Sequence, residues 1–237
     1  MRKDTPTRSS LDKLIAQDDE KFGPVRQSNL DRKLPVELFM PRFVEMIQDK
    51  PIFVLTSGKQ GSGKTTFVRK YFPEEVYFEI DDEDLTDEYV QTRTEKDKEW
   101  VMELGELCGL ICDWRYYGIE NWIHNKVTQF QEDNFSNSRP VVLDGIFPNK
   151  VTRSPYLRSA KEAGATYTCC FLFDVPICHA ILRKDKSEGA HPLYQNRMRQ
   201  FLNVFESPVN KHGSLEKGID TVIVINQEDT ITNIFYK

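Results

Sequence analysis

A glycine-rich run around residue 60 constrains the fold of this chain more than any other part of the sequence. Residues 58–65 read Gly-Lys-Gln-Gly-Ser-Gly-Lys-Thr and match the phosphate-binding pattern G-x-x-x-x-G-K-[ST] in full. The apolar residues 52–55 precede the run, and residues 65–70 can continue as a helix. A strand, a glycine-rich loop and a helix in this order point backbone N–H groups at a phosphate chain. The run therefore predicts an α/β fold with a site for a nucleoside triphosphate.

The side chains of this run have distinct expected roles. Lys64 is expected to reach the β- and γ-phosphates, and the Thr65 hydroxyl is expected to bind Mg²⁺. The alternative is a glycine-rich turn with a chance lysine, which the flanking strand and helix argue against. The residues expected to bind the nucleotide are Gly58, Gln60, Gly61, Ser62, Gly63, Lys64, Thr65 and Thr66.

The overall composition indicates one α/β domain with extensions. At 237 residues the chain is long enough to bury a substantial core. No apolar stretch approaches the roughly 20 residues of a membrane span, and residues 1–20 lack the apolar region of a secretory signal. Five cysteines in no disulfide framework add to the expectation of a cytoplasmic protein with reduced thiols. The net charge of −5 argues against broad nucleic-acid binding but leaves room for a local basic groove.

Five apolar runs rich in β-branched and aromatic residues predict the strands. They cover residues 52–56, 76–80, 141–144, 167–173 and 221–225. Such runs are typical of strands buried on both faces, and helical stretches separate them. We therefore expect a five-stranded parallel sheet with helices on both faces, formed within residues 34–237. Residues 1–33 are polar and interrupted by glycine and proline, which predicts a mobile or loosely docked arm.

The longest predicted helical region, residues 87–133, is unusually aromatic. One helical face holds Trp100, Leu104, Leu107 and Ile111, and Trp114, Tyr116, Tyr117 and Trp122 follow it. The simpler interpretation is a stripe of core residues. The alternative is that some of the rings line the pocket of an acceptor substrate, because ligand sites favour aromatic walls.

Acidic residues follow the second predicted strand, at the edge of the sheet where the phosphate loop also lies. Residues 81–84 read Asp-Asp-Glu-Asp, and the carboxyl ends of parallel strands open on one crevice. A carboxylate at this place can accept the proton of an attacking hydroxyl in phosphoryl transfer. The alternative is a solvated acidic turn that starts the next helix.

The third predicted strand ends in Asp144, the Walker B form, whose carboxylate is expected to support Mg²⁺. Gly145 follows, where an ATP-driven motor commonly places a glutamate that activates water. The sequence at this strand therefore disfavours a hydrolysing machine. An ordinary strand-ending turn is the alternative interpretation.

Two basic clusters flank a loop that contains glycine and proline, residues 187–192. Arg183, Lys184 and Lys186 precede the loop, and Arg197 and Arg199 follow it. Together they suggest a lid, about residues 183–200, whose closure excludes water and brings guanidinium groups to a transferring phosphoryl group. Basic residues on a solvated helix face are the alternative.

The two arginines after the loop are not equivalent. Arg197 and Arg199 are two positions apart and cannot face the same way on a helix. Arg197 shares a side with Tyr194 and Phe201, which favours Arg197 as the arginine that reaches the site.

Taken in order, these motifs resemble those of the P-loop kinases of small metabolites and nucleic-acid ends, most closely the zeta-toxin-type kinases and the polynucleotide 5′-hydroxyl kinases. The resemblance spans roughly residues 51–227. The matching parts are the loop 58–65, the carboxylate-ended strand 76–84, Leu143-Asp144-Gly145, residues 171–176 followed by Arg183, and the closing strand 221–226. The phosphate loop is specific by itself, and the other parts gain weight from their order.

The resemblance implies a three-layer P-loop NTPase fold with the strand of the phosphate loop in the centre and a helical lid. It implies an ATP- and Mg²⁺-dependent kinase, in which Lys64 and the loop amides hold the phosphates. Thr65 and Asp144 would handle the metal. Arg183 and Arg197 would stabilise the transferring group.

An aspartate after the second strand is the implied catalytic base. Leu85, matched to the apolar residue that follows the base of polynucleotide kinases, favours Asp84, whereas proximity to the strand end favours Asp82. Glu83 departs from the I-D-x-D pattern of the zeta type. The acceptor stays open between a hydroxyl of a nucleic acid, at a 5′ end or on a modified base, and one of a nucleotide-type small molecule such as a nucleotide sugar. A P-loop ATPase or nucleotide switch without phosphotransfer is the alternative of a different class.

Overall fold

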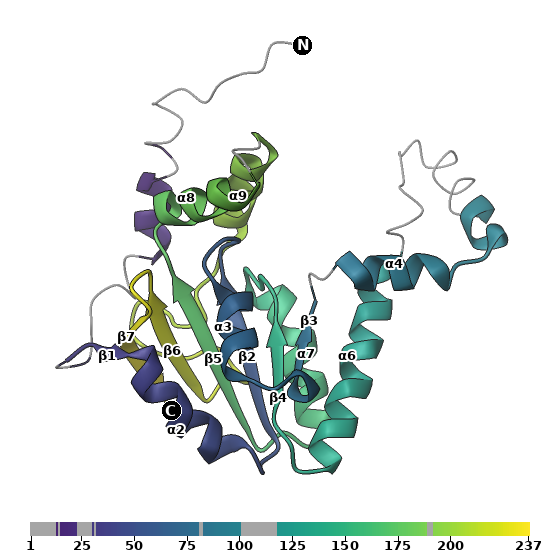
Figure 1. The fold of residues 1–237 in the computed structure, drawn as a ribbon, viewed down its shortest axis with the longest axis horizontal. Helices are drawn as coiled ribbons and strands as arrows, with labels where there is room; N and C mark the ends of the chain where they lie inside the picture. The colour runs from purple at the N-terminus through teal and green to yellow at the C-terminus, as the bar shows by residue number, and fades with distance from the viewer. Residues whose placement is uncertain are drawn as a thin grey trace.

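A seven-stranded mixed sheet forms the centre of the protein (Figure 1). The computed structural model describes residues 13, 15–22, 30, 32–80, 83–100, 118–188 and 192–237. The strands in chain order are β1 (Leu34–Pro35), β2 (Ile52–Gly58), β3 (Tyr77–Glu79), β4 (Val141–Asp144), β5 (Tyr167–Asp174), β6 (Thr221–Asn226) and β7 (Thr230–Tyr236). Their order across the sheet is β1-β7-β6-β5-β2-β4-β3.

All five strands predicted from the apolar runs are present, as β2 to β6. Strand β2, which leads into the glycine-rich loop, pairs in parallel with β5 on one side and β4 on the other. β3 and β6 extend the parallel set outward, so β2 lies at its centre. This central place puts the loop after β2 in the middle of the sheet's carboxyl edge.

The prediction of a five-stranded, wholly parallel sheet is wrong, because β7 and β1 add two strands at one edge through antiparallel pairs, β6 with β7 and β7 with β1. β7 follows β6 after the three residues 227–229, a connection too short for a parallel crossover. Its sequence, Thr-Ile-Thr-Asn-Ile-Phe-Tyr, mixes polar and apolar residues, as expected of a strand that is half exposed. Such a strand contains no continuous apolar run by which the sequence would indicate it.

Helices cover both faces of the sheet, as predicted. Figure 1 labels the helices α2 (Val36–Ile47), α3 (Lys64–Tyr71), α4 (Glu83–Gln91), α6 (Ile119–Ser136), α7 (Lys150–Glu162), α8 (Ile177–Glu188) and α9 (Pro192–Val204). Figure 1 shows α2 and α3 on one side of the sheet and α7 on the other. Alternate residues of β2 divide between two cores accordingly: Val54 packs in the cluster that contains α2 and α3, and Phe53 and Leu55 pack in the cluster that contains α6 and α7.

The aromatic region before α6 is described only in part. Trp100 has about half of its side chain exposed (51%), and Trp122 on α6 packs against Tyr89 of α4 at a ring distance of 5.5 Å. The remaining members of the predicted stripe, Leu104, Leu107, Ile111, Trp114, Tyr116 and Tyr117, lie outside the described residues. The choice between a core stripe and an acceptor pocket stays a prediction.

Residues 15–22 form a helical segment that lies beside α8, drawn in purple in Figure 1. Its Phe22 is fully buried and belongs to the same core cluster as Phe53 and Leu55. Within the described ranges, no helix combines the length and the apolar character that crossing a membrane requires.

Candidate functional site

The glycine-rich loop connects β2 to α3 at the carboxyl edge of the sheet. Gly58 has φ +147°, and a Cβ at this position would lie 2.8 Å from the carbonyl oxygen of Phe173 on neighbouring β5. Gly63 takes a left-handed conformation at the start of α3 (φ +95°), where its carbonyl accepts the first helical hydrogen bond, from the Phe67 amide. Glycine is therefore needed at both ends of the loop, because a side chain would clash at the first and be strained at the second.

The amine of Lys64 lies inside this loop. It donates to the carbonyl oxygens of Gly58 (3.0 Å) and Lys59 (2.9 Å), and the side chain is buried. The cation is thus held beside the loop that would surround a phosphate chain, and its contact with the β- and γ-phosphates stays a prediction.

Thr65 and Asp144, the two residues predicted to handle a metal, are in direct contact. The Thr65 hydroxyl donates to Asp144 Oδ2 at 2.6 Å, and the Thr56 hydroxyl donates to Asp144 Oδ1 at 2.6 Å. Asp144 is buried, so its orientation is determined by these two hydroxyl groups. Its carboxylate and the Thr65 hydroxyl are oxygen ligands of the kind that suit Mg²⁺, which usually takes its other ligands from phosphates and water. In the part of the chain that the structure describes, no group of three or more His, Cys, Asp or Glu is placed so that it could hold a metal ion.

Thr56 is a residue of this site that the sequence motifs do not indicate. Its only signal is a hydroxyl-bearing residue near the end of an otherwise apolar strand. Nothing local indicates that this hydroxyl contacts a carboxylate 88 positions later in the chain. The parallel pairing of β2 with β4 brings them together.

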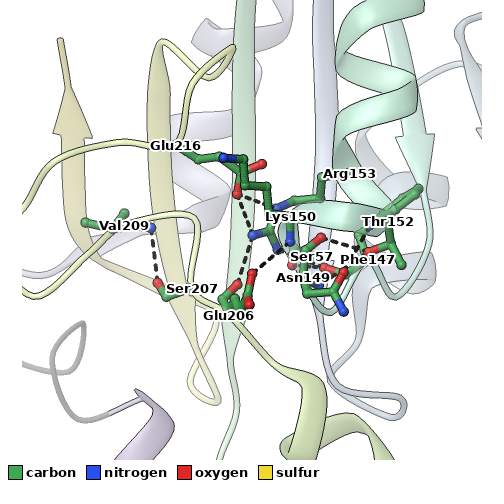
Figure 2. Close-up of polar contacts among 10 residues, drawn as sticks. All are labelled: Ser57, Phe147, Asn149, Lys150, Thr152, Arg153, Glu206, Ser207, Val209 and Glu216. Atoms are coloured by element: carbon green, nitrogen blue, oxygen red, sulfur yellow. Dashed lines mark hydrogen bonds and ion pairs between the residues drawn. The ribbon is translucent and has the colours of Figure 1, made fainter.

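The loop after β4 is held by a serine hydroxyl of β2 and by a buried arginine (Figure 2). The Phe147 carbonyl accepts hydrogen bonds from Ser57 Oγ (3.0 Å) and from Arg153 Nη1 (3.0 Å). Arg153 is fully buried; its Nη2 and Nε donate to Glu216 Oε2 at 2.6 and 3.0 Å, and Nη2 also donates to the Glu206 carbonyl at 2.9 Å. These contacts fix the position of the chain directly after Asp144.

Gly145, the residue after Asp144, lies under an aromatic ring. A Cβ at this position would lie 2.7 Å from the nearest ring carbon of Phe147, which is itself buried. A larger residue at 145 would displace the Phe147 ring. The glutamate of hydrolysing motors, absent from the sequence here, therefore also lacks room in the packing.

Arg183 of α8 is the predicted lid arginine that the structure places against the phosphate loop. Its Nη1 donates to the Ser62 carbonyl (3.0 Å) and its Nη2 to the Gln227 carbonyl (2.9 Å) in the turn after β6.

Among the other basic residues of the predicted lid, Arg199 is exposed on α9. Arg197 also belongs to α9, but its side chain lies outside the description, as do those of Lys184 and Lys186.

The predicted catalytic carboxylates are only partly described. Asp81 and Asp82 lie outside the described residues, and Asp84 falls in the first turn of α4 with its side chain outside the description. Ile80, directly before them, donates its amide to the Asp144 carbonyl at 2.9 Å. Ile80 therefore lies beside the end of β4, and the choice between Asp82 and Asp84 stays a prediction.

Another carboxylate at the end of β3, Glu79, is engaged in an ion pair. Arg69 of α3 donates from Nε and Nη2 to its two carboxylate oxygens, each at 2.7 Å. This bidentate contact links the end of β3 to the helix that follows the phosphate loop. The sequence does not indicate this contact, because Arg69 and Glu79 belong to different elements.

The described cysteines play no part in this site. Cys169 and Cys170 are free thiols on β5, and burial raises the pKa of Cys170 to about 12 and that of Cys169 well above its ordinary value. Both thiols are therefore protonated at neutral pH, which makes them poor nucleophiles. Cys178 is also a free thiol, as expected; Cys108 and Cys112 lie outside the described residues.

The fold and the loop geometry define a phosphate-binding-loop protein of the α/β class. The model of the family described as "AAA domain" matches residues 53–208. The chain belongs to this family, and the expected membership of the P-loop superfamily is confirmed. No curated protein sequence matches the chain significantly.

Several solved structures are similar to the chain at low sequence identity. A sugar kinase from Janibacter sp. HTCC2649 shares 15% identity over 75% of this chain and 84% of that chain, with a TM-score of 0.41. The PezAT toxin–antitoxin system of Streptococcus pneumoniae shares 14% identity over 99% and 83%, with a TM-score of 0.42. A gluconokinase from Sinorhizobium meliloti 1021 shares 13% identity over 75% and 82%, with a TM-score of 0.38.

Proposed function

We propose that the protein is an ATP- and Mg²⁺-dependent kinase that transfers the γ-phosphoryl group to a hydroxyl of its acceptor. The observation on which this proposal chiefly rests is the contact of the Thr65 hydroxyl with Asp144 beside the loop that holds Lys64. Hydroxyl, carboxylate and lysine amine together form the donor half of a phosphoryl-transfer site.

Each group in this donor half has a defined task. The loop amides and Lys64 bind the phosphates and neutralise charge on the transferring group. The Thr65 hydroxyl and the Asp144 carboxylate would hold Mg²⁺, which neutralises charge on the phosphate oxygens. Arg183 donates to the loop at Ser62 and orients α8 beside the phosphates. Arg197 lies on the following helix, α9, and we propose that it contacts the transferring group in addition to Lys64.

The acceptor half is proposed to lie at the end of β3. A kinase needs a carboxylate there that accepts the proton of the attacking hydroxyl. Because Glu79 is paired with Arg69, the base falls to the residues that follow Ile80. Asp82 and Asp84 are the candidates.

The packing around Gly145 favours transfer to an acceptor over hydrolysis. A water-activating glutamate at this position would clash with the buried Phe147 ring. An ATPase or nucleotide switch without phosphotransfer is therefore the weaker candidate. Rapid release of ADP in the absence of any acceptor would favour it instead.

The acceptor itself is identified by direct labelling. We would incubate the protein with γ-labelled ATP and two acceptor panels, oligonucleotides with free 5′-hydroxyl groups and nucleotide sugars. The net charge of −5 favours the small acceptor, because binding along a nucleic acid backbone gains from excess positive charge. Label in a nucleotide sugar would support the small-molecule class, and label at oligonucleotide 5′ ends would support the nucleic-acid class. No labelled acceptor, with hydrolysis of ATP, would contradict the kinase assignment.

The catalytic base can be found by paired substitutions. Asp82→Asn and Asp84→Asn each remove one carboxylate at nearly constant size. We expect one of them to lower kcat by about 10²–10⁴-fold, the range of general acid–base catalysis, with little change in the KM for ATP. Asp87→Asn, at an exposed position on α4, the helix that contains Asp84, is the matched control and should leave kcat unchanged. Wild-type kcat in both test variants would contradict a base at this strand end.

The metal site is tested by the hydroxyl of Thr65. Thr65→Val removes the hydroxyl that contacts Asp144 at nearly constant volume, whereas Thr65→Ser keeps it. We expect the valine variant to need about 10–100-fold more Mg²⁺ for half-maximal activity, the usual cost of losing a group at a metal site. The serine variant should stay close to wild type. Equal Mg²⁺ requirements in all three proteins would argue against a metal at Thr65.

A further inference from the structure

The helical segment of residues 15–22 is anchored to the end of α9. The Phe22 ring stacks on Phe205 at a centroid distance of 4.2 Å and an interplanar angle of 11°. Gln17 donates to the side chain of Asn203 (2.9 Å), and the Lys21 amine donates to the Phe205 carbonyl (3.4 Å). Stacked aromatic rings and polar contacts thus hold this segment on the protein.

One charged contact of the segment reaches the phosphate loop. Asp18 Oδ1 lies 2.8 Å from the amine of Lys59, the second residue of the glycine-rich run, and the two side chains are 2% and 0% exposed. The Lys59 amine also lies over the Phe22 ring, 3.5 Å from its centroid. A buried pair of this kind is strongly sensitive to the loss of either partner, because the remaining charge has no solvent to stabilise it.

The other oxygen of Asp18 reaches helix α8. Asp18 Oδ2 accepts a hydrogen bond from the backbone amide of Ile177, the first residue of α8, at 3.3 Å. A carboxylate at this end of a helix satisfies an amide that has no partner within the helix and interacts favourably with the helix dipole. One carboxylate therefore joins the phosphate loop to the start of α8.

Helix α8 contacts the loop a second time through Arg183, which donates to the Ser62 carbonyl. Arg183 is six residues after Ile177, about 9 Å further along the helix axis. The phosphate loop is thus attached to α8 at two places: through Asp18 at Lys59, and directly through Arg183 at Ser62.

We propose that residues 15–22 are a positioning element of the nucleotide site, in which Asp18 holds the phosphate loop at the distance from α8 that nucleotide binding requires. Asp18 acts through Lys59 and the Ile177 amide, and is therefore a positioning residue rather than a catalytic one. This inference rests on the proposed function to the extent that the loop must bind ATP.

The test uses the full chain and a cycle of two substitutions. Asp18→Asn removes the charge that faces Lys59 and keeps an oxygen that can accept from Ile177. Lys59→Met removes the cation at similar length, and the double variant removes both charges together. Glu20→Gln, which neutralises an exposed carboxylate of the same segment, is the matched control. The dissociation constant for ATP with Mg²⁺ is measured by calorimetry, and the melting temperature of each variant is recorded.

We expect the dissociation constant for ATP to rise about tenfold in both single variants and by no more than that in the double variant, since the two residues act as one contact. The melting temperature should fall in the single variants and recover in the double variant, in which no unpaired charge is buried. Glu20→Gln should match the wild type in both measurements.

Three results would overturn the inference. In the first, Asp18→Asn binds ATP as tightly as wild type. In the second, the affinity for ATP and the melting temperature both recover in the double variant, which would show that the ion pair contributes to stability and not to nucleotide binding. In the third, the two single losses multiply in the double variant, so that the residues act separately. If Asp18→Asn does not fold, the double variant decides, because it buries neither charge.

The calorimetric readout separates this inference from the proposed function. A wild-type protein that binds ATP but transfers no phosphoryl group would contradict the kinase assignment and leave the Asp18 test valid. A wild-type protein that binds no ATP would contradict both. Normal transfer and binding by Asp18→Asn would contradict the positioning role alone.

Discussion

Replacing Lys64 by alanine should lower kcat/KM by about 10²–10³-fold, the usual cost of removing one donor that stabilises transition-state charge. The Lys64 amine lies within the phosphate loop, bound to the carbonyls of Gly58 and Lys59, where it would meet the β- and γ-phosphates. Initial rates with labelled ATP and the acceptor found by the panel experiment measure the effect. The fold should remain intact, because the backbone of the loop is held by the glycine conformations and by its neighbours on β5.

Lys70→Ala is the matched control for this prediction. Lys70 belongs to the same helix α3 but is exposed. Its removal should leave both kcat/KM and the circular dichroism spectrum unchanged. Full phosphotransfer by Lys64→Ala would refute the assignment of this loop as the donor site. An equal loss in both lysine variants would point to a general effect of charge.

The second large effect should be on stability, from Arg153→Met. The substitution leaves the Glu216 carboxylate buried without its cation and removes the donors to the carbonyls of Phe147 and Glu206. Breaking a buried ion pair by removing one partner typically costs about 3–5 kcal/mol. We expect the free energy of unfolding in urea to fall by about that amount. The melting temperature should fall by about 6–20 °C, at roughly 2–4 °C per kcal/mol for a chain of this size.

Two further variants test whether the loss of stability comes from the buried ion pair. Arg158→Met, at an exposed position on the same helix α7, should change the free energy of unfolding by less than about 0.5 kcal/mol. The double variant Arg153→Met/Glu216→Met should recover part of the loss, because apolar residues of similar volume replace a buried pair with little cost. A free energy of unfolding within about 1 kcal/mol of wild type for Arg153→Met would show that these contacts contribute little.

The part of the site that could be predicted from the sequence is the part that is local. The roles expected for the glycines, Lys64 and Thr65 depend on a short stretch in which strand, loop and helix follow one another directly. Asp144 could be anticipated as well, because it ends an apolar strand. Its contact with Thr65 needed one further step, the rule that parallel strands end at the same edge of a sheet.

Several supporting residues could not be predicted, because their partners are far away in the chain. Arg153 pairs with Glu216, 63 positions later, and Asp18 pairs with Lys59 from a segment predicted to be a mobile or loosely docked arm. In the sequence these side chains look like ordinary charged residues of polar segments. Nothing local distinguishes a charge that will be buried from one that will be solvated.

In the sheet, too, some strands could be predicted from the sequence and others could not. The five apolar strands were recognisable because burial on both faces requires continuous apolar sequence. β7 was missed because it mixes polar and apolar residues, and β1 because it is only two residues long. Their addition makes the sheet mixed and gives it seven strands.

The sequence by itself determined the phosphate-binding loop, the α/β class and the parallel centre of the sheet, because these depend on short-range patterns of glycine and apolar residues. Only the tertiary structure decided which residues support the loop. Thr56 donates a hydrogen bond to Asp144, and Arg153 donates one to the Phe147 carbonyl. Asp18 pairs with Lys59 and accepts a hydrogen bond from the first amide of α8. The physical reason is burial. A polar side chain acquires a fixed partner when the fold removes it from water, and which side chains are removed depends on how distant segments pack.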